Sequence, residues 1–317
     1  MIKKQRKYYY EIVLLFIILF VIHKIYLNPN DNNFENEKAY EVTVISSYFS
    51  LNKSKHNHKE YNDWIKNFFS SVSPLVLFTD GKSISRELMS LRKNLATRFY
   101  IVDSHWNLLE EIEKKRGKKY SASYRQEQNR LDPEQSIHNP DLYILWNMKS
   151  YITKKVVQEN PFSSSVFIYT DAGAWRSKPL YNWPDVKMVR NVSKLIKNKI
   201  LFGQISNSGL EKSSRFPLCD IIEGTFFMGN AKAIENFEKE FWRLHDIRIE
   251  QGLFVGKDQT IMNLLAFNST MSYSIARLKT WDLKCEKPVD VWHFYQYFLA
   301  NDNYYKCERP REKFLIY

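Results

Sequence analysis

Apolar positions along the chain follow two alternating patterns. Short apolar runs, typical of buried strands, occupy 40–49, 74–78, 98–102, 166–169, 200–205, 221–228 and 272–278. Apolar residues three or four positions apart predict helices over 60–69, 84–95, 141–157, 186–196, 231–244 and 256–265. This alternation predicts an α/β fold with a mixed, mostly parallel sheet flanked by helices.

One polar stretch breaks the alternation. Residues 120–140 follow a basic run at 114–119 and contain few large apolar side chains. This composition predicts an inserted loop near a site, or a lid, and an ordinary solvated surface loop explains it equally well.

The N-terminal segment differs from the rest of the chain. A basic tail, 1–7, precedes an apolar stretch at 8–27 that has the roughly 20 residues needed to cross a bilayer. No small-residue cleavage pattern follows it, so we expect an uncleaved signal anchor, with a cleaved secretory signal as the alternative. A polar stem, 28–38, then leads into a globular domain at 39–317.

The charge distribution bears on orientation and partners. Because the basic tail precedes the predicted span, the positive-inside rule predicts a single-pass type II membrane protein. Its membrane would be that of the Golgi or another secretory compartment in a eukaryote, or the inner membrane in a bacterium. The formal net charge of +12 suits an anionic ligand or a negative membrane surface. Neither zinc-finger spacing nor a basic helix with heptads occurs, which argues against nucleic acid as a partner.

The chain has three cysteines, Cys219, Cys285 and Cys307. In an oxidising compartment, Cys285 and Cys307 can pair across a short C-terminal loop and leave Cys219 unpaired. The sequence alone leaves this pairing open.

The stretch after the apolar run 166–169 carries candidate chemistry. Asp171 and Gly173 follow the run, and Arg176 comes three residues later. In open α/β sheets, ligands bind at the carboxyl ends of central strands, where a glycine permits close approach. A carboxylate and a permanent cation at this edge suit a metal-bound diphosphate. The ordinary alternative is a strand followed by a turn and a capping Asp.

Two other motifs combine with this stretch. The helical segment Trp146-Asn147-Met148-Lys149 leads into the strand end Tyr169-Thr170-Asp171-Ala172-Gly173, and Asp258-Gln259 opens a later helix. Together these motifs resemble the HtrL/YibB (WlaTC-like) family, which is assigned to the glycosyltransferases, over residues 42–295. The resemblance implies a GT-A-like fold, in which a nucleotide-binding half joins an acceptor-binding half.

The resemblance also implies residues that bind a nucleotide-sugar donor. We expect the first strand's end to contact the base and ribose, through Ser46, Ser47 and Tyr48, although strand-end capping is as plausible. Asp80 can hydrogen-bond the ribose, whereas Asp103 is better explained as a helix N-cap. Lys149 would reach the phosphates or the sugar, and its alternative is a solvated lysine on a helix. Asp171, Gly173 and Arg176 would complete the donor site.

A divalent cation is implied by the same resemblance. GT-A enzymes usually hold Mn²⁺ or Mg²⁺ with an Asp-x-Asp motif, and here Gly173 stands at the third position. Asp171 would then bind the cation with His293, because hard cations need few protein ligands when phosphate oxygens complete the shell. If no metal takes part, Lys149 and Arg176 must neutralise the leaving diphosphate. The alternative for His293 is a satisfied core histidine.

Two acidic residues are candidates for catalysis. Asp258 would act as the general base that deprotonates the acceptor hydroxyl, with a helix cap as its alternative. Glu223 starts an apolar strand, an unusual place for a charge unless it is paired or useful. We expect Glu223 to contact acceptor or donor-sugar hydroxyls, and a buried ion pair is the alternative.

These features predict a membrane-anchored glycosyltransferase. It would move a sugar from a nucleotide-sugar donor, with a UDP-sugar favoured, to a hydroxyl of a glycan acceptor. One alternative is a non-catalytic, membrane-anchored carbohydrate-binding protein on the same fold, which Gly173 favours. Another is a nucleotide-sugar hydrolase or a phosphosugar transferase.

Overall fold

A computed structural model describes residues 39–51, 56–120, 124–178, 182–281, 285, 290–301 and 311–317. All of them belong to one compact unit, Ala39–Tyr317. The predicted tail, membrane span and stem lie outside the described residues. Within the described ranges, no helix has both the length and the apolar character that a membrane crossing requires.

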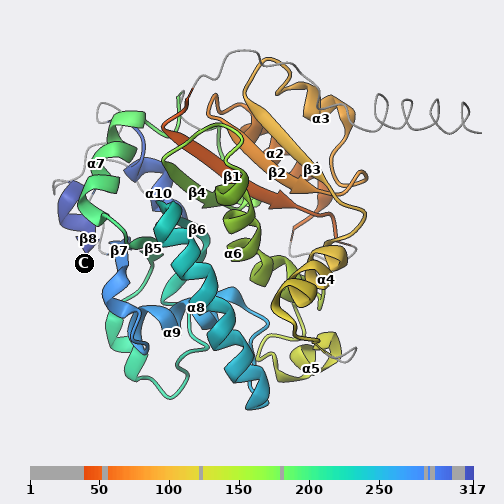
Figure 1. The fold of residues 1–317 in the computed structure, drawn as a ribbon, viewed down its shortest axis with the longest axis vertical. Helices are drawn as coiled ribbons and strands as arrows, with labels where there is room; N and C mark the ends of the chain where they lie inside the picture. The colour runs from red at the N-terminus through yellow and green to blue at the C-terminus, as the bar shows by residue number, and fades with distance from the viewer. Residues whose placement is uncertain are drawn as a thin grey trace, which may run out of the picture. The chain divides into compact units, whose positions relative to one another are not determined.

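A mixed sheet of eight strands forms the centre of the described unit, in the order β3-β2-β1-β4-β6-β5-β7-β8 (Figure 1). Its strands are β1 (Val42–Tyr48), β2 (Leu75–Thr79), β3 (Thr97–Ile101), β4 (Val166–Thr170), β5 (Ile200–Gln204), β6 (Ile222–Asn230), β7 (Ile275–Lys279) and β8 (Leu315–Ile316). The strands from β3 to β4 pair in parallel, as do β5 and β7, whereas β6 and β8 run antiparallel to their neighbours. The predicted mixed, mostly parallel sheet is confirmed.

Helices cover both faces of the sheet. They are α2 (His58–Phe69), α3 (Arg86–Ser90), α4 (His105–Arg116), α5 (Tyr124–Leu131), α6 (Leu142–Glu159), α7 (Val186–Ile196), α8 (Ala231–Glu250), α9 (Asp258–Phe267) and α10 (Phe294–Phe298). One hydrophobic core receives side chains from α4, α5, α6, α8 and α9, and α6 packs along α8. A second core, on the other face, receives side chains from α2, α3, α7 and α10.

Polar caps fix where several helices begin and end. Asn57 and Glu60 form a capping box at the start of α2, in which each side chain accepts from the other's backbone N–H. Asn230 ends β6 and caps α8 by accepting from the Ala233 N–H. Gly117 ends α4 in the left-handed region, with φ of 63°, where a glycine carries no steric cost.

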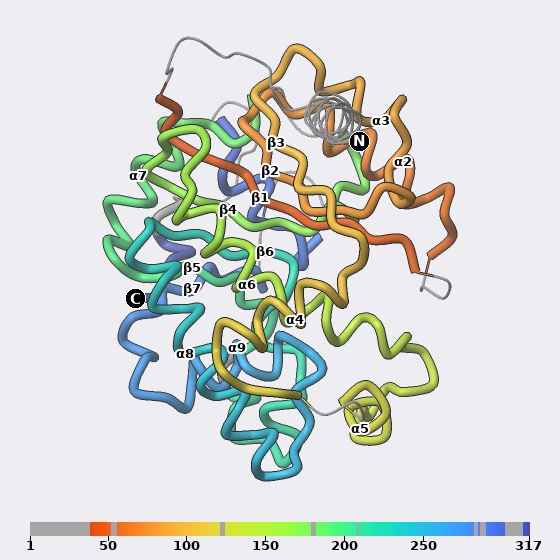
Figure 2. The backbone as a smooth tube through the Cα atoms, turned by 45° about the vertical axis from the view of Figure 1, so that its right-hand side comes forward, coloured from red at the N-terminus to blue at the C-terminus, as the bar shows by residue number. Residues whose placement is uncertain are grey.

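The direction of chain progression reverses between β1 and β4. From β1, the chain moves outward to β2 and β3, and it then returns to add β4 on the other side of β1. Figure 2 shows β3, β2, β1 and β4 following one another across the sheet. This is a topological switch point, and crevices at the carboxyl ends of such strands are where open α/β sheets bind ligands.

The structure corrects three predicted elements. The polar segment 120–140 contains the helix α5, which buries only Tyr124 and Gln128 and therefore lacks a strong apolar period. The helix predicted over 84–95 is limited to α3, because the chain then turns and the buried Arg92 donates to the backbone carbonyls of Phe69, Ser71 and Ser73. Ser104, not Asp103, caps α4.

The two described cysteines differ in state. Cys285 is disulfide-bonded, whereas Cys219 is a free thiol. Cys307, the partner predicted for Cys285, lies outside the described residues.

Candidate functional site

A pocket of about 230 Å³ lies at the carboxyl ends of β1 and β4. Residues from both strand ends, from α2 and α6, and from the C-terminal part of the chain line it. They are Ser47, Tyr48, Phe49, Ser50, Leu51, His58, Tyr61, Leu142, Leu145, Trp146, Lys149, Asp171, Ala172, Gly173, Ala174, Arg176, Thr225 and His293. The pocket therefore coincides with the switch point of the sheet.

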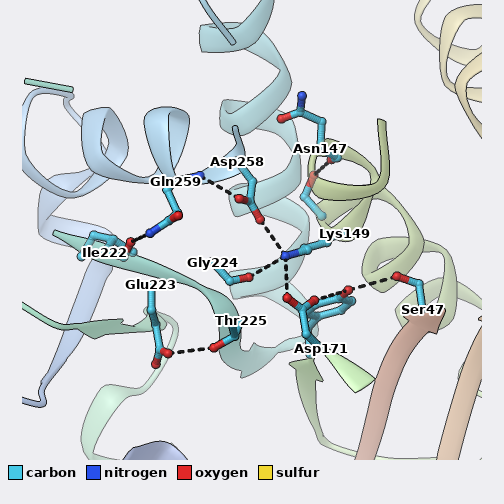
Figure 3. A network of polar contacts seen from close by, with 12 residues as sticks. Ser47, Asn147, Lys149, Asp171, Ile222, Glu223, Gly224, Thr225, Asp258 and Gln259 are labelled. Atoms are coloured by element: carbon cyan, nitrogen blue, oxygen red, sulfur yellow. Dashed lines mark hydrogen bonds and ion pairs between the residues drawn. The ribbon is translucent and has the colours of Figure 1, made fainter. Parts of the chain in front are cut away.

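Lys149 is the central charge of the site (Figure 3). Its ammonium nitrogen lies 3.0 Å from Asp171 Oδ2, 3.0 Å from Asp258 Oδ2 and 2.8 Å from the Gly224 carbonyl oxygen. The contacts with Asp171 and Gly224 are hydrogen bonds, and Asp258 faces the ammonium group as an ion-pair partner. Lys149 is a buried residue on a helix whose other inward positions are mostly apolar, so its charge depends on these partners.

The two carboxylates keep Lys149 charged. Burial acts to lower the pKa of Lys149, but Asp171 and Asp258 together outweigh it, so the pKa lies above its ordinary value. The carboxyl group of Asp258 is itself only 5% exposed, and burial raises its pKa despite the nearby ammonium. Asp171 is 29% exposed and is the member of this trio that presents a carboxylate to the pocket.

The strand β6 explains why a backbone carbonyl is free for Lys149. Its residues from Phe226 onward pair with β4, whereas its first residues extend beyond the end of β4. In this extension, the Gly224 carbonyl accepts from Lys149, and the Ile222 carbonyl accepts from Gln259 Nε2 at 2.7 Å. A Cβ on Gly224 would lie 2.8 Å from Asp258 Oδ1, so a glycine is needed where the carboxylate packs against the strand.

Tyr169 connects Asp171 to the first strand. Its hydroxyl donates to Asp171 Oδ1 at 3.0 Å and lies 3.1 Å from the Ser47 hydroxyl. Burial raises the pKa of Tyr169 well above its ordinary value, and the Asp171 charge adds to the effect, so the phenol stays a donor. Both oxygens of Asp171 are therefore hydrogen-bonded, one to Tyr169 and the other to Lys149.

Arg176 supplies an exposed cation on another wall of the pocket. Its Nε donates to the Gly173 carbonyl at 3.0 Å, and its guanidinium carbon lies 3.6 Å from the centre of the Trp64 ring. These two contacts fix the plane of the guanidinium, and its two terminal nitrogens have no hydrogen-bond partner among the described residues. The geometry suits a bidentate contact to a phosphate or carboxylate.

His293 lines the pocket with an acidic neighbour behind it. Its Nδ1 lies 3.0 Å from Asp290 Oδ2, and this hydrogen bond lowers the pKa of Asp290. A carboxylate on one ring nitrogen orients the imidazole, which is the usual arrangement of a positioned base or ligand. Across the described residues, no group of three or more His, Cys, Asp or Glu side chains is arranged to hold a metal ion.

Seven of the predicted site residues line the pocket: Ser47, Tyr48, Lys149, Asp171, Gly173, Arg176 and His293. Four others lie away from it. Ser46 is fully buried on the face of β1 opposite to Ser47, and Asp80 accepts from the backbone N–H groups of Lys82 and Ser83 in a turn. Asp258 lies behind Lys149, and the fully buried Glu223 bonds to the Thr225 hydroxyl at 2.8 Å.

The aromatic wall of the pocket was not predicted. Tyr61 and Trp64 have the helical spacing of core residues in α2, yet Tyr61 lines the pocket and Trp64 supports Arg176. Trp146 belongs to the motif that suggested the family, but its own role had no signal in the sequence.

Fold and site together define a mixed α/β protein with a charged, aromatic-walled pocket at the switch point of its sheet. The chain belongs to the family described as "Bacterial protein of unknown function (HtrL_YibB)", which it matches over residues 40–298. The family that the sequence resembles is thereby confirmed. A comparison with curated proteins finds no match.

Two solved structures show a distant likeness. Mouse xyloside xylosyltransferase 1, in its apo form, is 10% identical, with a TM-score of 0.44 over 73% of this chain and 83% of that one. Core-mannan synthase A from Aspergillus fumigatus, in its Mn/GDP form, is 12% identical, with a TM-score of 0.45 over 75% of this chain and 72% of that one. Likeness at this level does not carry an activity to this chain.

Proposed function

We propose that this protein transfers a sugar from a nucleotide-sugar donor to a hydroxyl group of a glycan. The observation that carries the proposal is the convergence of Ser47, Lys149, Asp171, Arg176 and His293 from distant parts of the chain on one pocket. The pocket combines fixed cations for a diphosphate with aromatic and hydroxyl groups for a base and a sugar.

The lining residues divide by chemistry. Arg176, whose terminal nitrogens have no hydrogen-bond partner in the described part of the chain, is suited to the diphosphate, and the ammonium of Lys149 adds positive charge nearby. Tyr48, Tyr61 and Trp146 offer aromatic surface for a base or a sugar ring. His293, oriented by Asp290, is the lining residue best suited to accept the proton of the acceptor hydroxyl.

We further propose that the protein is anchored by the apolar segment 8–27 and that the pocket faces an oxidising compartment. The disulfide at Cys285 supports such a compartment, because disulfides persist mainly outside the cytosol. The basic tail before the segment supports a type II orientation. Proteolysis of sealed vesicles tests the orientation, since a protease on the cytosolic side should then leave the 39–317 domain intact.

The activity is tested by the release of nucleoside diphosphate from a panel of UDP- and GDP-sugars, with oligosaccharide acceptors. We expect Asp171→Asn to lower transfer at least 100-fold, because the pocket loses its carboxylate and Lys149 loses a partner. Asp80→Asn is the matched control, since Asp80 caps a turn outside the pocket. Circular dichroism verifies that both variants are folded.

Three results would contradict the proposal. Full activity in Asp171→Asn would remove the central residue of the site. Glycan binding by the wild-type protein, with neither nucleotide binding nor transfer for any donor, would instead favour the non-catalytic carbohydrate-binding protein. Release of free sugar without an acceptor product would identify a hydrolase.

A further inference from the structure

The position of Lys149 bears on the cation that the resemblance implies. Where two carboxylates bind one divalent cation, the cation lies between them and contacts both. Here Asp171 and Asp258 face each other across an ammonium group that is 3.0 Å from each. The place of a shared cation is taken by a side chain of the protein itself.

The partners of Lys149 show how firmly it is held. Its ammonium group hydrogen-bonds to Asp171 and to the Gly224 carbonyl and lies 3.0 Å from Asp258 Oδ2 as an ion pair, and its side chain is only 6% exposed. A divalent ion between the carboxylates would have to displace this ammonium from both of them and from the Gly224 carbonyl. An ion bound by Asp171 with His293 would meet a carboxylate whose two oxygens are already hydrogen-bonded to Tyr169 and Lys149, and the fixed positive charge of Lys149 would repel it. The residues present therefore do not fit a divalent cation held by Asp171 and Asp258.

We propose that Lys149 is a built-in cation, which replaces a divalent metal between Asp171 and Asp258. If the pocket binds a nucleoside diphosphate, as the proposed function requires, that binding is independent of metal. Arg176 then makes the direct contact to phosphate, because its terminal nitrogens have no hydrogen-bond partner among the described residues, whereas the Lys149 ammonium already faces two carboxylates and a carbonyl. Asp258 acts in this arrangement as a positioning residue that holds the ammonium.

The first experiment measures Mn²⁺ binding to the purified protein, by calorimetry and by electron paramagnetic resonance of the free ion. We expect no Mn²⁺ binding that depends on Asp171 in the wild-type protein. Lys149→Ala leaves two carboxylates without their cation, so it should bind Mn²⁺ at least tenfold more tightly than wild type. Adding Asp171→Asn to that variant should abolish the gain.

The matched control is Lys154→Ala in the same helix. Lys154 also forms an ion pair, 2.6 Å from Glu238, but Glu238 has no second carboxylate opposite it in this pair. Lys154→Ala should therefore gain no Mn²⁺ binding. A thermal melt of each variant establishes that it is folded before its metal binding is compared with wild type.

The second experiment needs no substitution and decides the matter if Lys149→Ala does not fold. UDP and GDP are titrated into the wild-type protein in EDTA and in Mn²⁺, and we expect affinities that agree within threefold. A tenfold loss in EDTA, or wild-type Mn²⁺ binding that Asp171→Asn removes, would overturn the inference. So would a folded Lys149→Ala variant that binds no Mn²⁺. If neither nucleotide binds under any condition, the proposed function fails, while the Mn²⁺ titrations still test the built-in cation.

Discussion

Asp258→Asn is the substitution whose effect on stability follows most directly from the geometry. It keeps the shape of the side chain and removes one of the two charges that hold Lys149. Removing one partner from a buried ion pair costs about 3–5 kcal/mol when the other charge is left alone. Lys149 retains Asp171 and the Gly224 carbonyl, so we expect a loss nearer to one charged hydrogen bond, about 2–3 kcal/mol.

Denaturant unfolding followed by tryptophan fluorescence measures this loss. Glu238→Gln is the control, because its partner Lys154 is 22% exposed and water can replace the lost carboxylate. We expect the control to lose about 1 kcal/mol or less. If Asp258→Asn is no more destabilised than Glu238→Gln, then Lys149 does not depend on Asp258, and the reasoning about the buried trio is wrong.

Three other predictions test separate features. Burial raises the pKa of Glu223 well above its ordinary value, so the native state keeps a proton that the unfolded chain releases. Stability should therefore fall as pH rises from the unfolded pKa towards the folded pKa. Glu223→Gln should flatten this fall in thermal melts, and an unchanged slope would contradict it. Arg176→Lys should weaken UDP or GDP binding about tenfold, as measured by calorimetry, because lysine lacks the planar guanidinium that rests on Trp64. Equal affinity would rule out the bidentate contact. Gly224→Ala should destabilise the protein by about 2–3 kcal/mol, because its Cβ would lie 2.8 Å from Asp258 Oδ1. Gly209→Ala is the control and should change stability little, because its Cβ would meet only Asn207 Oδ1, at 4.0 Å.

Much of the fold could be predicted because its strands are continuous apolar runs. β4 is buried at every position, and the pattern makes the residue after it, Asp171, a site candidate, which the family resemblance then favours over a capping Asp. Helix α5 could not be predicted in this way, because one of its two buried residues is a polar glutamine. The Gln128 side chain accepts from the Val255 N–H at 2.7 Å, a contact that only the tertiary structure supplies.

The site was less predictable than the fold, because side-chain pairing across the chain decides it. Ser46 and Ser47 are neighbours in sequence, but strand alternation sends one to the buried face and the other towards Tyr169. Asp258 was expected to face the acceptor, and the structure instead has it behind Lys149, where it does not line the pocket. Whether any of these residues acts in catalysis stays a prediction.

The contacts of Lys149 also have a consequence for how the molecule folds. They join α6, the end of β4, the start of β6 and the start of α9, so they need β4 and β6 paired and both helices packed against them. A buried ammonium without these partners would be costly, so a partly assembled chain gains little from forming any one of the contacts. Assembly of the pocket and pairing of β4 with β6 should therefore be one cooperative event, and the backbone amides around Gly224 and Asp258 should exchange with solvent only through global unfolding.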